Sequence, residues 1–136
     1  MAGTMTCTLD SRAGSGVRVL TVAWTSDASG NATGTTPVLI GRLVKAVTVP
    51  SASVAPTDNY DIAMTDEQGL DVLTGVQSTL ANRDTANTEQ VYFLVLDAAG
   101  TPLAQSVHPL VANALSISVT NAGNAKSGTL YLYLEA

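Results

Sequence analysis

The chain has 136 residues, the length of one domain, and with 46% hydrophobic and 12% charged residues it is too apolar to be disordered. Its net charge is −5 and its six Lys and Arg residues are scattered, so nothing clusters to neutralise phosphates and direct nucleic-acid binding is not expected. No apolar run approaches the roughly 18 residues of a transmembrane helix, and no polybasic or amphipathic stretch indicates a membrane-surface patch.

The first third of the chain predicts two strands and a loop. Residues 5–10 alternate, so residues 1–16 are expected to form an edge strand or an N-terminal arm that ends in a Gly/Ser turn. Residues 17–26 are the clearest strand, and because both faces are largely apolar we expect a central strand covered on both sides. Residues 27–36 are rich in Gly, Ser and Asn and predict a loop.

Residues 38–49 form a long run rich in β-branched side chains, which we interpret as one buried strand. Gly41 interrupts this run, and a glycine inside a strand indicates a bulge or the close approach of another backbone. Gly41→Val is therefore expected to lower stability by more than about 2 kcal/mol through strain or overpacking. The same change at Gly30, in the polar loop, is expected to cost far less.

The rest of the chain continues as short strands and turns. Residues 66–69 predict a tight turn that closes a hairpin, and residues 75–87 favour a loop. Further strands are predicted at 60–65, 70–73, 89–96, 103–107, 115–120 and 129–135. About eight strands at even spacing indicate an all-β fold over residues 1–136, a single antiparallel β-sandwich of jelly-roll or Ig-like type, with under about 15% helix.

The single cysteine, Cys7, cannot form an internal disulfide, and its alternating surroundings predict a small buried hydrophobic residue. No charged segment followed by an apolar one opens the chain, so no signal peptide is expected. Both features are typical of a protein made in a reducing cytoplasm.

Five acidic residues lie close together in the sequence: Asp58, Asp61, Asp66, Glu67 and Asp71. Calcium needs several oxygen atoms converging from a tight loop, and this spacing does not follow the EF-hand order. We expect solvated turns in which Asp58 or Asp66 accepts hydrogen bonds from nearby amides, and no specific divalent-metal site. His108 precedes a proline and has no second ligand at metal-binding spacing, so a capping or interface role is expected for it.

No catalytic residues and no cofactor site are predicted. The chain lacks a Gly-x-Ser-x-Gly elbow, and the Gly-Ser-Gly at 14–16 lacks the length and the lysine of a phosphate-binding loop. The chain is therefore not expected to be an enzyme.

The candidate interface residues are three aromatic side chains, Trp24, Tyr131 and Tyr133. Trp24 ends a predicted central strand, where core or rim packing competes with ligand stacking as an interpretation. If the leucines at 130, 132 and 134 fill the core, Tyr131 and Tyr133 point outward, where tyrosine is favoured in protein interfaces. The alternative is that this strand is also covered on both sides, with the tyrosines inside.

Low charge with many Thr and Ser residues suits a surface shared between subunits, although an ordinary Thr-rich β domain has the same composition. We expect a homo-oligomer, with a trimer as the first expectation, because one small domain does not easily hide this apolar share.

Six motifs together resemble small accessory virion proteins of tailed bacteriophages, over roughly residues 17–134. They are WTSDA at 24–28 followed by Gly30, IGRL at 40–43, PTDNYDI at 56–62, DEQGLDVL at 66–73, SVTNAG at 118–123 and SGTLYL at 127–132. The resemblance implies a β-sandwich that joins the particle as a head decoration (cement) protein, or as a component near the portal and tail. It implies the major capsid protein or other virion proteins as partners, and it assigns no binding residues.

The expected function is that of a non-enzymatic structural protein of a phage virion, bound to the capsid exterior through protein–protein contacts. Within the virion, the alternative is a head–tail connector or tail-associated component. From another class, the alternative is a carbohydrate- or receptor-binding β module, which would need a concave pocket with several exposed aromatic side chains. Four Tyr and one Trp supply few such side chains.

Overall fold

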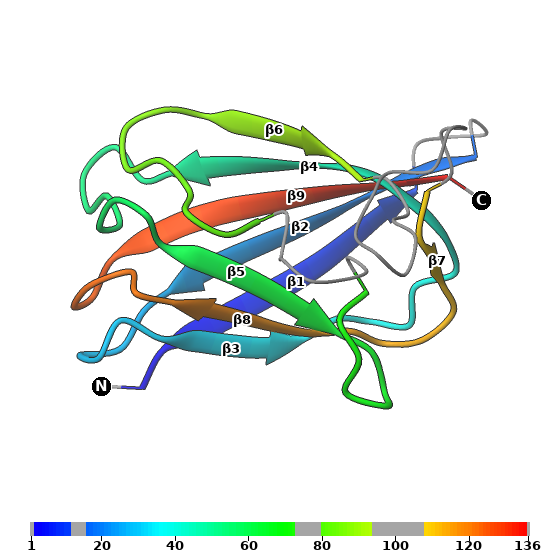
Figure 1. Cartoon of the computed structure of the whole chain (residues 1–136), viewed down its shortest axis with the longest axis horizontal. Coiled ribbons are helices and arrows are strands. Elements are labelled where there is room, and N and C mark those ends of the chain that lie inside the picture. The colour runs from blue at the N-terminus through cyan, green and yellow to red at the C-terminus, as the bar shows by residue number, and fades with distance from the viewer. Residues whose placement is uncertain (1, 12–15, 73–79, 94–107, 136) are drawn as a thin grey trace, which may run out of the picture.

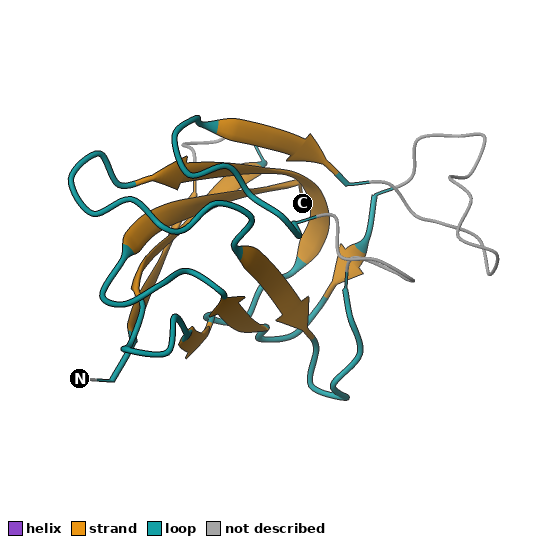
Figure 2. Ribbon diagram, turned by 60° about the vertical axis from the view of Figure 1, so that its left-hand side comes forward, coloured by secondary structure: helices purple, strands orange, loops and turns teal. Residues whose placement is uncertain are grey.

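The computed structural model describes residues 2–11, 16–72, 80–93 and 108–135, which form two antiparallel β-sheets (Figures 1 and 2). The strands are β1 (Thr4–Ser11), β2 (Val17–Thr25), β3 (Ala32–Thr35), β4 (Gly41–Pro50), β5 (Asp61–Thr65), β6 (Glu89–Tyr92), β7 (Leu110–Val111), β8 (Ser116–Thr120) and β9 (Ser127–Glu135). The larger sheet has the order β1-β2-β9-β4-β6, with β7 paired to β4, and the smaller sheet has the order β3-β8-β5. The described residues contain no helix, so the predicted all-β sandwich is confirmed.

The core lies between the two sheets, and strand alternation directs one side of each central strand into it. In the larger sheet Leu20 pairs with Leu132 and Val22 with Leu130, and all four side chains are fully buried. Such a side chain contributes about 1.5–3 kcal/mol of hydrophobic free energy. The central position predicted for β2 is confirmed, but its second face is only partly covered, because Ala23 is exposed there.

The smaller sheet covers this core with the alternating residues of β5 and β8. Ile62 pairs with Val119 and Met64 with Ile117, and these side chains are buried. Tyr60, just before β5, lies with its ring centre 5.5 Å from that of Trp24 on the opposite sheet. The sandwich therefore has one continuous apolar core.

Burial of Tyr60, 1% exposed, raises the pKa of its hydroxyl to about 12 from 10.0. Because this folded-state pKa lies above the unfolded one, the stabilisation is complete below about pH 10 and is lost as pH rises through about 12. We expect the free energy of unfolding to fall by up to about 2–3 kcal/mol over this range.

Tyr60→Phe should remove that part of the pH dependence, as urea unfolding of both proteins from neutral to alkaline pH will test. Every other side chain is the same in both proteins, so the difference between their two pH profiles belongs to Tyr60. If the free energy of unfolding fell equally in the two proteins at alkaline pH, the assignment of this pH dependence to Tyr60 would be contradicted.

Two strands lie where the sequence did not predict them. Within the expected loop at 27–36, residues of β3 pair with β8 from Ala32↔Val119 to Thr35↔Ser116. The two-residue strand β7 pairs with the start of β4. Both are short, and they are held by residues about 70 or more positions away, so local composition carried little sign of them.

The strand predicted at 38–49 begins later, at Gly41, and the interpretation of one continuous buried strand is wrong for its first three residues. Val38 and Ile40 are 60% and 61% exposed, and only Leu39 between them is buried, its amide donating to the carbonyl of Asn113. Pro37 precedes this segment and cannot donate to a ladder. The β-bulge of β4 lies further on, between Leu43 and Lys45.

The close backbone approach predicted at Gly41 is confirmed. Gly41 has a φ of +139°, and a Cβ there would lie 2.3 Å from the carbonyl oxygen of Glu135. Gly30 is not the permissive position that its polar loop indicated. It has a φ of +86°, it is buried, and a Cβ would lie 2.8 Å from the amide nitrogen of Gly123.

The turn predicted at 66–69 is present, with the Gly69 amide donating to the Asp66 carbonyl. Of the returning strand predicted at 70–73, the described residues 70–72 form one isolated bridge, between Thr65 and Asp71. Of the other predicted segments, residues 80–87 form a loop, while 73–79, 94–96 and 103–107 lie outside the described residues.

Candidate binding face

Tyr131 and Tyr133 lie on the side of β9 that faces away from the core. The leucines that alternate with them, at 130, 132 and 134, are fully buried in the core. This is the arrangement in which the sequence analysis expected the tyrosines to point outward. Both tyrosines are half-buried among neighbouring strands. The sequence pattern therefore predicted their direction correctly.

Residues directly opposite in an antiparallel pair share a face, so the register shows what surrounds each tyrosine. Tyr131 lies between Thr21 of β2 and Val47 of β4, and Tyr133 lies between Val19 and Lys45. We call this surface of the larger sheet the tyrosine face. It comprises Thr6, Thr8, Thr21, Ala23, Lys45, Val47, Val49, Gln90, Tyr92, Thr129, Tyr131 and Tyr133, together with Val19, which points to the same side but is buried.

Lys45 joins two aromatic rings on the tyrosine face. Its Nζ lies 4.7 Å from the ring centre of Tyr133 and 5.7 Å from that of Tyr92, and it donates to Gln90 Oε1 at 3.4 Å. Cation–π contacts of this kind contribute about 0.5–1 kcal/mol at exposed sites. Tyr92 is 56% exposed, which makes it the most accessible aromatic side chain of the face.

Sequence reasoning missed Lys45 and Tyr92 as members of this site. The only available signal was the alternation predicted at 89–96, which places Tyr92 on one face of a strand without saying which face is solvated. Residues 45, 92 and 133 meet because β4 lies between β6 and β9.

Few charges interrupt the tyrosine face. Lys45 lies within it, while Asp10, Arg42 and Glu135 lie at its margins. Depletion of charge with enrichment of tyrosine is typical of the buried centre of protein interfaces. The face offers contact area, tyrosine and threonine hydroxyl groups, and the Lys45 cation held over two tyrosine rings.

Trp24, the third candidate interface residue, lies in the core and not on this face. Its side chain is 3% exposed, stacks obliquely on Tyr60, and passes over Gly128, where a Cβ would lie 2.7 Å from the indole. Its Nε1 is buried, and no described residue forms a hydrogen bond with it. The core-packing interpretation of Trp24 therefore holds.

An open groove of about 460 Å³ crosses one end of the tyrosine face. Its lining is mostly small side chains: Thr4, Thr6, Ala23, Thr25, Val49, Pro50, Ser51, Ser127 and Thr129, with Trp24 and Gly128. Trp24, the aromatic member of this lining, is almost completely buried. The groove therefore lacks the exposed aromatic platform that the sequence analysis required of a sugar-binding pocket.

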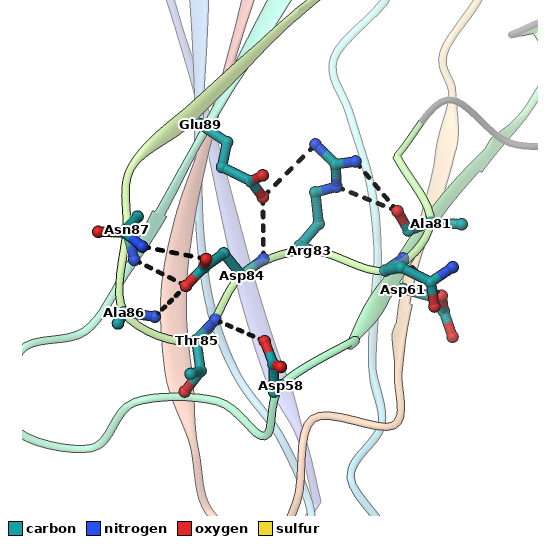
Figure 3. Close-up of polar contacts among 10 residues, drawn as sticks. Asp58, Asp61, Ala81, Arg83, Asp84, Thr85, Ala86, Asn87 and Glu89 are labelled. Atoms are coloured by element: carbon teal, nitrogen blue, oxygen red, sulfur yellow. Dashed lines mark hydrogen bonds and ion pairs between the residues drawn. The ribbon is translucent and has the colours of Figure 1, made fainter.

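Three of the five acidic residues of the 58–71 segment accept hydrogen bonds from main-chain amides. Asp66 Oδ1 accepts hydrogen bonds from the amides of Gln68 and Leu70, both at 2.9 Å, which confirms the predicted local role. Asp58 reaches further and accepts from the amide of Thr85 at 3.3 Å (Figure 3). Asp61 accepts from the Asn82 amide at 3.0 Å through one carboxylate oxygen.

A second set of polar contacts orders the loop before β6 (Figure 3). Asp84 accepts hydrogen bonds from the amides of Ala86 and Asn87 and from the Asn87 side chain, and these bonds lower the pKa of its carboxyl group. Glu89 accepts from the Asp84 amide at 2.9 Å and lies 3.6 Å from the Arg83 guanidinium. These carboxylates act as structural acceptors.

No group of three or more potential metal ligands forms within the part of the chain that the structure describes. We therefore expect a chelator such as EDTA to leave the melting temperature unchanged, because a bound ion would stabilise the fold by mass action. A fall of more than a few degrees in differential scanning calorimetry, restored by added calcium, would contradict this.

His108 forms a hydrogen bond with the main chain of another segment. His108 Nδ1 lies 2.7 Å from the carbonyl oxygen of Phe93, so the ring links the residues before β7 to the end of β6.

Cys7 is half-buried against the core on β1, and burial raises the pKa of its thiol. A thiol with a raised pKa is a poor nucleophile at neutral pH.

Among the described residues, no helix has the length and apolar character needed to cross a membrane.

No family model matches the chain, and no curated protein matches it. One similar solved structure is described as the structural basis for the promiscuous specificity of carbohydrate-binding modules from the β-sandwich superfamily. It is 18% identical with a TM-score of 0.33, and the alignment covers 98% of this chain and 56% of that one. The chain thus spans little more than half the length of that structure, and at this TM-score the likeness supports no inference about what the chain binds.

Proposed function

We propose that the chain is a non-enzymatic structural protein of a tailed-phage virion, which binds the capsid exterior through its tyrosine face. The observation that carries this proposal is the face itself, in which Tyr131 and Tyr133 lie among Thr, Val and Ala side chains with charges mainly at the margins. The resemblance of the sequence to accessory virion proteins supplies the expected partner, the major capsid protein.

The dimensions of the tyrosine face suit a protein interface. Strands about 4.8 Å apart with about 3.3 Å per residue give a five-strand surface roughly 20 Å by 25 Å. A standard interface buries about 800 Å² per partner, so this surface and its margins can supply most of one. Tyrosine adds contact area at low cost in conformational entropy.

A capsid surface repeats the same site many times, which allows a weak contact to give stable attachment. If the protein docks as an oligomer, every contact after the first is intramolecular and benefits from a high effective concentration. The Thr-rich, weakly charged face is consistent with this mode of binding, since affinity need not come from one deep pocket.

The test uses virions of the phage that encodes the chain, purified with wild-type protein or with the Tyr131→Ala/Tyr133→Ala variant. We expect wild-type protein to co-purify at a copy number close to that of the major capsid protein, and the variant to be reduced by about tenfold or more, as for loss of two interface anchors. Thr33→Ala/Thr35→Ala, two exposed positions of β3 outside the face, is the matched control and should bind normally.

Urea unfolding of each variant separates loss of binding from loss of folding. Thr21→Arg adds a charge beside Tyr131 without removing any core contact, and it serves if the tyrosine variants are unstable. Absence of the wild-type protein from purified particles would overturn the proposal. A few copies per particle would instead favour the head–tail or tail-associated alternative.

A further inference from the structure

The edges of the two sheets differ in how their main-chain groups are satisfied. The outer edge of β5 is closed by its own chain, through hydrogen bonds from the Arg83 amide to the Tyr60 carbonyl and from the Val72 amide to the Met64 carbonyl. β6, at one edge of the larger sheet, is only four residues long. β1, at the other edge, is eight residues long.

The outer edge of β1 is regular, and no described strand pairs with it. It pairs with β2 in an unbroken register from Thr4↔Thr25 to Ser11↔Arg18, without a bulge. Within the described chain, the main-chain groups of residues 4–9 make no hydrogen bonds other than those to β2. An antiparallel strand directs alternate N–H and C=O groups to its two edges, so a row of them points away from the sheet.

The side chains of β1 also show an uncovered flank. Met5, Cys7 and Leu9 pack against the core yet remain half-buried, whereas their partners Val22 and Leu20 on β2 are fully buried. β3 lies against β1 at Met5, whose side chain covers Gly34. A further strand beside β1 would cover this flank and pair the open main-chain groups.

We propose that β1 pairs antiparallel with β1 of a second copy of this chain, making one continuous sheet through a two-fold dimer. Around a two-fold axis perpendicular to the sheet, each face of β1 meets the same face of its partner. Thr6 and Thr8 then lie beside threonines of the second copy, and the apolar side chains of Met5, Cys7 and Leu9 lie beside one another.

The composition of β1 favours pairing with β1 of a second copy. Strands that avoid edge pairing carry charged side chains, Pro or bulges, and residues 4–11 contain a single charge, Asp10 near the end of the strand, with no Pro and no bulge. Cross-strand Thr–Thr pairs contribute about 0.2–1 kcal/mol each, and β1 supplies them to itself. The result is a dimer with two coplanar tyrosine faces, in place of the trimer first expected. The pairing is independent of the virion role and can be tested without particles.

Sedimentation velocity across a concentration series is the first measurement, since one strand pair gives a weak, concentration-dependent dimer. Thr6→Lys/Thr8→Lys should raise the dimer Kd by about tenfold or more. Whether the pairing is centred on residue 6, 7 or 8, it places introduced lysines of the two copies directly opposite each other, and like charges there repel. Thr33→Lys/Thr35→Lys adds the same charge to exposed positions of β3 and should change Kd less than about threefold.

Two further readouts distinguish edge pairing from contact through the tyrosine face. Amide hydrogen exchange should slow with concentration at residues 4–11, and Tyr131→Ala, in β9, should leave the dimer intact. A protein that stays monomeric at its highest soluble concentration would overturn the proposal. So would a dimer that Tyr131→Ala abolishes while β1 amides exchange at the same rate at all concentrations.

Discussion

Replacing Gly41 with valine is expected to lower the free energy of unfolding by more than about 2 kcal/mol, through two separate costs. The φ of +139° is a conformation that residues with a side chain rarely adopt, and the added Cβ would lie 2.3 Å from the Glu135 carbonyl oxygen. That oxygen belongs to the main chain of β9, which is paired with both β2 and β4 and cannot easily move.

Gly69 provides the matched control for the steric cost of the contact between an added Cβ and the Glu135 carbonyl oxygen. It also has a positive φ, +78°, but nothing lies within 4 Å of a Cβ built there. Gly69→Ala should therefore cost only the backbone strain, about 1–2 kcal/mol, and Gly41→Ala should cost clearly more. Urea unfolding of the two alanine variants measures the difference, and equal losses would show that the contact with Glu135 relaxes without penalty.

Trp24→Ala is expected to be the most destabilising change in the core, by about 3–5 kcal/mol, because a large aromatic side chain is removed from between the sheets. Trp24→Phe should cost much less. Phenylalanine keeps the ring contact with Tyr60 and removes an indole N–H that is buried without a partner, a group that costs about 1–3 kcal/mol.

Chemical unfolding measures the difference in free energy of unfolding between the two variants. The ring contact and the unpaired N–H both predict a gap of at least about 2 kcal/mol between alanine and phenylalanine. If phenylalanine is as costly as alanine, the indole nitrogen must find a partner in solution that offsets its burial.

The candidate site could be predicted from the sequence only in part. The direction of Tyr131 and Tyr133 follows from the alternation with leucine in β9, a local property. Their neighbours do not follow from it, because Lys45 and Tyr92 reach Tyr133 through strands that are distant in sequence. Trp24 was ambiguous for the same reason, since its burial depends on Tyr60 of the other sheet.

The sequence by itself determined the all-β class, the positions of β2, β8 and β9, the turn at 66–69 and the need for glycine at position 41. Each depends on alternation or backbone freedom within a few residues, which local physical chemistry dictates. Only the tertiary structure decided that β3 is a strand, that the strand predicted from Val38 begins at Gly41, and that residues 4–11, expected as an edge strand or an arm, form the edge strand beside β2. Those outcomes depend on which strands become neighbours, and pairing energy between residues far apart in the chain outweighs the weak preference of each short segment.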